Sequence, residues 1–384
     1  MRKFLDAPFL GRGFRPFFFF GALYAAFVMP LWVLTFCGVA IPPPNALFWH
    51  AHEMLFGFTV SIVAGFLLTA VANWTGGAPA RQIHLAGLVI LWVLGRGVVF
   101  SPNVPQWLAI GVEGLFLPAL ALSLAIPLWR SRNFRNMLFI GLLTALWLCD
   151  MASLATGDVG YIHTAVLIVM VKISTIGGRV IPAFTVASLR RRGINAFQPN
   201  MPKADIFALA CGITCIVFHA LLGVDVFATG MAFVLMALIN GYRLFKFNPA
   251  KAFADPMVWV LHVGFLWMIT GFALLGAASF GVLPISTALH AMTAGAIGTM
   301  CIGMMCRVAL GHTGRDISAD TLTIVMFSLI QVAAIIRVFG SMLMPDHYDR
   351  IIEASGGLWA VVFLIYAFRY APILFSSRPD GQTA

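Results

Sequence analysis

Apolar runs of about twenty residues recur along the whole chain and are separated by short polar segments. A run of this length crosses the hydrocarbon core of a bilayer as one α-helix. The pattern therefore predicts an all-α, polytopic membrane protein in which residues 1–384 form a single transmembrane domain, with short cytoplasmic tails at 1–15 and 376–384. About twelve spans are expected, near residues 16–38, 47–71, 83–100, 106–129, 134–156, 161–189, 204–223, 226–246, 257–281, 284–309, 320–343 and 355–375.

The composition supports this class and the charges orient the chain. The chain is 61% hydrophobic and 10% charged, with a mean hydropathy of +0.94. Most of its 24 Lys and Arg residues lie in the terminal segments and in the loops after even-numbered spans. By the positive-inside rule, we expect a bacterial inner-membrane protein with both termini in the cytoplasm. This topology explains the basic clusters without a nucleic-acid partner.

One sparse pattern occurs twice, each time with a histidine at its head. Relative to His52 and to His290, Met, Gly, Gly, Thr and Gly follow at offsets of 2, 5, 13, 23 and 24 residues. Both segments belong to predicted spans that run from outside to inside, so both imidazoles lie near the periplasmic face. An ionisable group at such a depth indicates a functional site. Two imidazoles on separate helices are the axial ligands that a haem needs, so His52 and His290 are the predicted haem ligands.

Further ionisable residues are expected in the same leaflet. Arginine forms bidentate pairs with carboxylates, so two of these residues, Arg96 and Arg337, are candidate partners for haem propionates. Alternatively, Glu113 and Asp150 are simply counter-ions for these arginines. The residues of this leaflet are Arg96, Glu113, Asp150, His163, His219 and Arg337.

His50 and His52 point to nearly opposite sides of one helix, because they are two residues apart. They suit two neighbouring sites better than one shared metal. We expect His50 to bind a second metal, with His163 or His219 completing its ligands. In the alternative, one histidine is a ligand and the other donates a hydrogen bond across helices. His262 lies near the cytoplasmic start of its span, so we expect that it could serve only a second, deeper or inner site.

Spans 6 and 10 carry two further features. Lys172 and Arg179 share one helix face near mid-membrane, which indicates a bound anion, a channel or partners on other helices; Arg179 is thus a further candidate for cofactor binding. In span 10, Gly295, Gly298 and Gly303 would let either a flat macrocycle or another helix approach the backbone.

The chain resembles the NnrS family. The resemblance rests on six blocks that run from end to end: Phe14-Arg15-Pro16-Phe17-Phe18, Trp49-His50-Ala51-His52-Glu53-Met54-Leu55-Phe56-Gly57, Ala64-Gly65-Phe66-Leu67-Leu68-Thr69-Ala70-Val71, Asn73-Trp74-Thr75-Gly76, Gly178-Arg179-Val180-Ile181-Pro182-Ala183-Phe184-Thr185 and Leu310-Gly311-His312-Thr313-Gly314-Arg315. It implies a twelve-helix inner-membrane protein that contains haem and copper and is linked to nitric oxide metabolism and protection from nitrosative stress.

A distant analogy to subunit I of haem–copper oxidases supports haem b. Those proteins also have twelve helices, with haem ligands on helices 2 and 10 and copper ligands on helices 6 and 7; here spans 6 and 7 carry His163 and His219. The chain has no His-Pro-Glu block and no adjacent His-His pair. The analogy therefore does not predict oxidase-type chemistry.

The sequence thus predicts a protein that binds haem b and copper and that binds or turns over nitric oxide or a related small ligand. Its expected partners are that ligand, the lipid bilayer and an electron donor of unknown identity. An oxidoreductase that metabolises nitric oxide and a haem-based sensor without turnover both stay open. The rival from another class is a secondary transporter of a small anionic or metal-related substrate, for which Lys172 and Arg179 would be familiar features.

Overall fold

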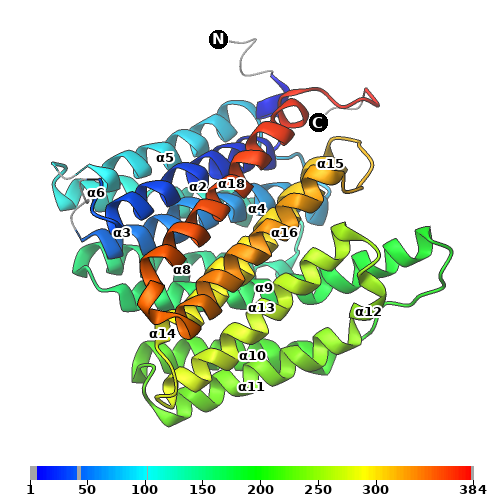
Figure 1. Cartoon of the computed structure of the whole chain (residues 1–384). Coiled ribbons are helices and arrows are strands. Elements are labelled where there is room, and N and C mark those ends of the chain that lie inside the picture. Colours follow the sequence, from blue (N-terminus) through cyan, green and yellow to red (C-terminus); the bar gives the residue numbers. More distant parts are fainter. Residues whose placement is uncertain (1–6, 41–44, 102, 382–384) are drawn as a thin grey trace. The chain divides into compact units, whose positions relative to one another are not determined.

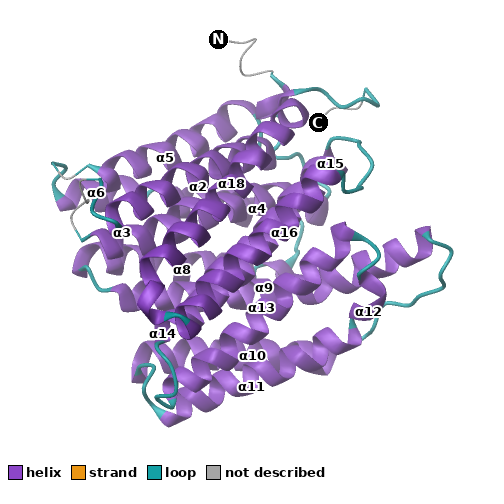
Figure 2. Ribbon diagram, viewed as in Figure 1, coloured by secondary structure: helices purple, strands orange, loops and turns teal. Residues whose placement is uncertain are grey.

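Twelve helices are long and apolar enough to cross a membrane in the computed structural model, which describes residues 7–40, 45–101 and 103–381. No strand occurs among these residues (Figure 2). The prediction of an all-α, multi-pass membrane protein is therefore confirmed.

In order, the spans are α2 (Phe14–Phe36); α3, η2 and α4 (Ala46–His52, Glu53–Thr59, Val60–Thr75); α5 (Gln82–Phe100); α6 and α7 (Gln106–Glu113, Phe116–Arg130); η3 and α8 (Phe134–Asn136, Leu138–Thr156); α9 (Val159–Arg191); α10 (Pro202–Leu222); α11 (Phe227–Lys246); α13 (Pro256–Ser279); α14, η4 and α15 (Ile285–His290, Ala291–Ile297, Gly298–His312); α16, η5 and α17 (Thr321–Ile335, Ile336–Gly340, Ser341–Leu343); and η6 and α18 (Pro345–His347, Tyr348–Phe375). The short elements η1 (Pro8–Leu10) and α12 (Pro249–Ala252) lie outside the spans.

The predicted bounds hold to within a few residues except at the last span. α18 begins at Tyr348, whereas the apolar run predicts a start near residue 355. Its first two turns carry Asp349, Arg350 and Glu353, which hydropathy assigns to a loop. The side chains of Arg350 and Glu353 form an ion pair at 3.1 Å, one turn apart, which is a spacing that supports an exposed helix end.

Backbone contacts divide the chain into two compact units, which we describe separately. Unit 1 comprises residues 1–165, 305–317 and 360–384, and unit 2 comprises residues 166–304 and 318–359. In unit 1, α2 packs against η2 and α4; in unit 2, α13 packs against α11 and η4. The expectation of a single transmembrane domain stays a prediction.

The repeated histidine pattern corresponds to a repeated local structure. His52 ends α3 and is followed by the seven-residue π-helix Glu53–Thr59; His290 ends α14 and is followed by the seven-residue π-helix Ala291–Ile297. π-Helical segments are rare and occur frequently at functional sites. The two segments share more than spacing, because each histidine lies at the same point of an α-to-π transition.

The first glycine of each pattern is a point of close helix contact. A Cβ at Gly57 would lie 2.6 Å from Cε1 of Tyr24, and one at Gly295 would lie 2.6 Å from Cδ2 of Trp267. Each glycine thus admits an aromatic ring from a helix of its own unit, which is the helix-packing role of small residues in membranes. At Gly295 in span 10, the close contact is with the neighbouring helix α13.

The Thr-Gly pair that closes each pattern ends a helix. Gly76 and Gly314 have φ angles of +66° and +69°, a left-handed conformation that glycine adopts without strain. The hydroxyls of Thr75 and Thr313 donate to carbonyl oxygens four residues earlier, at 2.8 and 2.6 Å. The end of each pattern is therefore a helix stop.

In unit 2, a buried arginine joins three helices. Nη1 of Arg243 donates to Oγ of Ser174 at 2.8 Å and to Oδ1 of Asn240 at 2.7 Å, and Nη2 lies 2.9 Å from Oδ1 of Asp205. Arg243 is 2% exposed and lies over the Phe265 ring. These bonds connect α9, α10 and α11.

Replacing Gly178 with alanine should destabilise this network. A Cβ there would collide with the guanidinium of Arg243, which would have to leave Ser174 and Asn240. A buried group left without its hydrogen bond costs about 1–3 kcal/mol, so the thermal midpoint of the detergent-purified variant should fall. Gly241→Ala is the matched control, because a Cβ at Gly241 meets nothing within 4 Å. Equal midpoints for the two variants would contradict this role of Gly178.

Candidate metal centre

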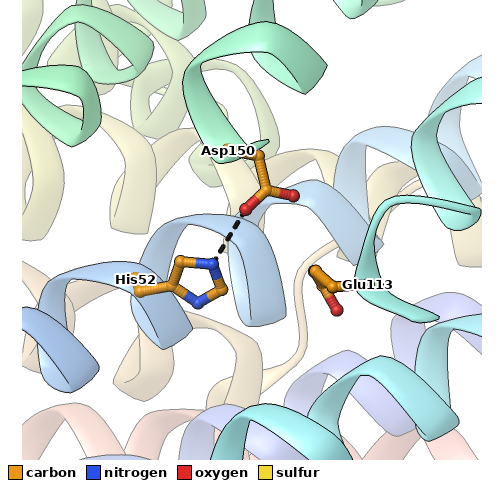
Figure 3. Close-up of side chains that lie close together, drawn as sticks. All are labelled: His52, Glu113 and Asp150. Carbon is orange, nitrogen blue, oxygen red and sulfur yellow. Dashed lines mark hydrogen bonds and ion pairs between the residues drawn. The ribbon is translucent and has the colours of Figure 1, made fainter. Parts of the chain in front are cut away.

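His52 lies at the centre of a buried polar group in unit 1. Its side chain is fully buried, with Nδ1 2.9 Å from Oε1 of Glu53 and Nε2 2.8 Å from Oδ1 of Asp150 (Figure 3). The rings of Phe48 and Phe56 lie on either side in sequence, with centroids 5.8 and 5.0 Å from that of the imidazole. Both ring nitrogens therefore face carboxylate oxygens in an otherwise aromatic environment.

Arg96 of α5 joins two further carboxylates to the group. Its Nη1 donates to Oε1 and Oε2 of Glu53 at 2.7 and 2.8 Å, and its Nη2 forms an ion pair with Glu113. The hydroxyl of Tyr24 also donates to Glu53. Glu113 thus pairs with Arg96, whereas Asp150 pairs with His52.

Glycines give these side chains their room. The Glu113 carboxylate lies against the backbone of Gly95 in α5, where a Cβ would collide with Oε2. At Gly57, a Cβ would lie 3.0 Å from Oε2 of Glu53 and 3.3 Å from Nη1 of Arg96. The first glycine of the histidine pattern therefore also makes space for the ion pair.

Three members of the group could hold a metal ion. One ligand atom from each of His52, Glu113 and Asp150 lies within 4.8 Å of the others, and each residue is buried. Oε2 of Glu113 is buried and has no hydrogen-bond partner. Counting Glu53, three carboxylates face one guanidinium and one imidazole. Because both ring nitrogens contact carboxylate oxygens, each carries a proton, which leaves one uncompensated negative charge. Such an excess is costly in a low-dielectric interior, and a divalent cation would balance it.

The donor types restrict the ion. An imidazole nitrogen suits Zn, Cu, Fe and Ni, and carboxylate oxygens suit harder cations; a mixed nitrogen and oxygen set is typical of Cu(II) among other divalent ions. Glu53, on Nδ1 of His52, is placed to orient the ring as carboxylates commonly do behind a metal-bound histidine. The residues present therefore fit copper as well as several other divalent ions.

His52 and Arg96 both have partners within this group. A haem iron or a single metal ion would each need one ring nitrogen directed at it, and both nitrogens of His52 contact carboxylates. A propionate partner needs an available guanidinium, but Arg96 is bonded to Glu53 and Glu113. The predicted roles of His52 and Arg96 toward haem stay predictions.

His290 lies in unit 2. Its Nδ1 lies 2.6 Å from the carbonyl oxygen of Ser286, a contact that requires the proton on Nδ1. A backbone carbonyl behind the ring is a common support for a metal-bound histidine. The ring is half-buried.

The remaining candidates lie elsewhere. His50 stacks on Trp32, with ring centroids 4.4 Å apart, and His163 and His219 are half-buried in α9 and α10. His262 is 4% exposed, and its Nδ1 lies 3.1 Å from the carbonyl oxygen of Val258. Among the described residues, none of these histidines belongs to a group of three metal-ligand side chains.

The two other predicted arginines have separate surroundings in unit 2. Nη2 of Arg337 donates to the hydroxyl of Tyr348 at 3.1 Å, and its guanidinium lies 5.4 Å from the centre of that ring. Arg179 is half-buried in α9, and its carbonyl oxygen accepts from Gln198. Arg96 is the one predicted arginine in the group around His52.

Sequence reasoning missed the roles of four residues. Glu53, Glu113 and Asp150 were treated as secondary to the histidines, and Tyr24 was not considered. The signal that could have found the acids is their occurrence in apolar spans, where a carboxylate requires a partner.

The fold and this group of side chains define a polytopic helical membrane protein with a buried site suited to a metal ion. The chain belongs to the NnrS protein family, whose sequence profile matches residues 8–378. No curated protein matches the chain.

Proposed function

We propose that this protein binds copper at the group of His52, Asp150 and Glu113, binds haem b through His290, and binds or turns over nitric oxide. The observation that carries the proposal is the buried group itself, in which a carboxylate oxygen without a partner lies beside a histidine and an excess of negative charge. The family resemblance supplies the link to haem, copper and nitric oxide.

The location follows from the charges of the loops. The protein lies in the bacterial inner membrane with both termini in the cytoplasm. His52 and His290 then lie near the periplasmic face. Nitric oxide is small and uncharged, so it can reach a buried site through the bilayer, and the electron donor of a turnover reaction stays unidentified.

The chain's own residues have defined parts in this proposal. Asp150 and Glu113 supply oxygen ligands, and Glu53 holds Nδ1 of His52 so that Nε2 faces the ion. Arg96 holds Glu53 and Glu113 in place through its two ion pairs. A bound copper ion would supply a redox-active centre that nitric oxide can approach.

A secondary transporter is the rival function, and one observation favours it. Lys172 is 3% exposed, and its Nζ has no hydrogen-bond partner. A buried ammonium of this kind would suit an anionic substrate near mid-membrane.

One experiment separates these functions. Detergent-purified protein, expressed with adequate haem and copper, is examined by metal analysis and by anaerobic absorbance in oxidised, reduced and nitric-oxide-treated states. We expect a Soret band that shifts with nitric oxide and copper in equal amount to the protein. A Soret band without a response to nitric oxide would contradict the proposed ligand, and a colourless, metal-free preparation would favour the transporter.

A further inference from the structure

Four arginines from distant parts of the chain converge at one end of unit 1. Arg12 precedes α2 and Arg15 lies in its first turn, Arg315 follows α15, and Arg378 follows α18. Figure 1 shows the start of α2 and the end of α18 at the same end, and the rings of Phe9 and Phe375 stack there at 4.1 Å. We call Arg12, Arg15, Arg315 and Arg378 the arginine cluster.

Arg15 is the most buried member of the cluster, and two of the three nitrogens of its guanidinium have no hydrogen-bond partner. Its side chain is 0% exposed, and Nη1 donates to the carbonyl oxygens of Leu374 and Ser376 at 2.7 and 2.8 Å. Its Nε and Nη2 are buried without a hydrogen-bond partner. Because an unsatisfied charged donor is costly inside a protein, these two atoms indicate an acceptor that belongs at this position.

Arg12 repeats this arrangement at the edge of the cluster. Its Nη1 donates to Nδ1 of His312 at 3.1 Å, and its Nε is buried without a partner. Burial and the nearby guanidinium of Arg378 lower the pKa of Arg12. The cations of the cluster are therefore close enough to repel one another.

Arg315 and Arg378, the other two members of the cluster, are also held by hydrogen bonds. Arg315 donates to Oγ of Ser376 at 3.0 Å, and Arg378 donates to the carbonyl oxygen of His312 at 3.1 Å. In the described part of the chain, Arg378 forms an ion pair with Asp380, and this is the ion pair found for the four arginines of the cluster.

We infer that the arginine cluster binds a phosphate group. Guanidinium groups present paired N–H donors that match phosphate oxygens, and the unpartnered donors of Arg12 and Arg15 need acceptors. A tetrahedral phosphate can accept from several arginines at once, whereas a carboxylate offers two oxygens. At a membrane-facing helix end, the group belongs either to a phospholipid headgroup or to a soluble phosphate.

The test uses the full-length protein in a non-ionic detergent, with dioleoyl phosphatidylglycerol and sodium pyrophosphate as separate probes. Binding is measured by native mass spectrometry for the lipid and by the thermal midpoint for both probes. We expect saturable binding of at least one probe and at least a tenfold weaker apparent affinity in Arg12→Gln/Arg315→Gln. Binding of the lipid alone assigns the site to a headgroup, and binding of both probes assigns it to phosphate in general.

The control is Arg81→Gln/Arg135→Gln, which removes two exposed arginines of the same unit and should leave binding unchanged. If the cluster variant does not fold, the single variant Arg315→Gln, which keeps Arg12 with His312, replaces it and should still weaken binding. Binding of neither probe by the unaltered protein, or equal affinities in the cluster and control variants, would overturn the inference.

Discussion

Arg96→Met should largely abolish the folded protein. The substitution leaves Glu53 and Glu113 buried at 0% and 4% exposure without their cation. Removing one partner of a buried ion pair costs about 3–5 kcal/mol, and here a single arginine neutralises two carboxylates. We therefore expect a low yield of monodisperse protein and a clearly lower thermal midpoint in detergent.

Two further variants test whether the loss of stability comes from the ion pairs of Arg96. Arg96→Lys keeps the charge but lacks the planar fork that reaches both carboxylates, so it should recover only part of the stability. Arg135→Met removes an exposed arginine of the same unit and should behave as the unaltered protein. If Arg96→Met purifies with normal yield and midpoint, the two ion pairs do not hold this site together.

His52→Ala and Asp150→Asn should each remove bound copper while keeping the Soret band. Each takes away one of three ligand side chains, whereas the haem in our proposal depends on His290. His290→Ala should give the converse result, with copper kept and the Soret band lost. The measurements are metal analysis and absorbance on the same purified samples.

A graded series sharpens this prediction. Glu53→Gln keeps all three ligands but weakens the support on Nδ1 of His52, and such changes lower metal affinity roughly 10–100-fold. His84→Ala, which removes an exposed histidine bonded to Ser123, is the matched control. Loss of the Soret band in His52→Ala would return this residue to the role of haem ligand, and unchanged copper in both ligand variants would exclude the proposed centre.

The helices were predictable because the signals for them are local. Nearly every span agrees with an apolar run, and the exception, the start of α18, is a polar helix end that hydropathy cannot distinguish from a loop. The repeated histidine pattern also had a structural meaning, since Gly57 and Gly295 admit rings from neighbouring helices and Gly76 and Gly314 end helices. The π-helices after the two histidines had no signal in the spacing, because their register depends on how the neighbouring helices pack.

The sequence by itself determined that this chain is a multi-pass helical membrane protein and that His52 lies where an imidazole needs a partner. Only the tertiary structure decided which partner. Asp150 is 98 residues from His52, and Glu113 reaches the group through Arg96 of another helix. Hydropathy depends on each segment alone, whereas the pairing of buried charges depends on which helices pack together and how each is rotated. That is why the contacts of His52 with Asp150 and of Arg96 with Glu113 could not be predicted from the sequence.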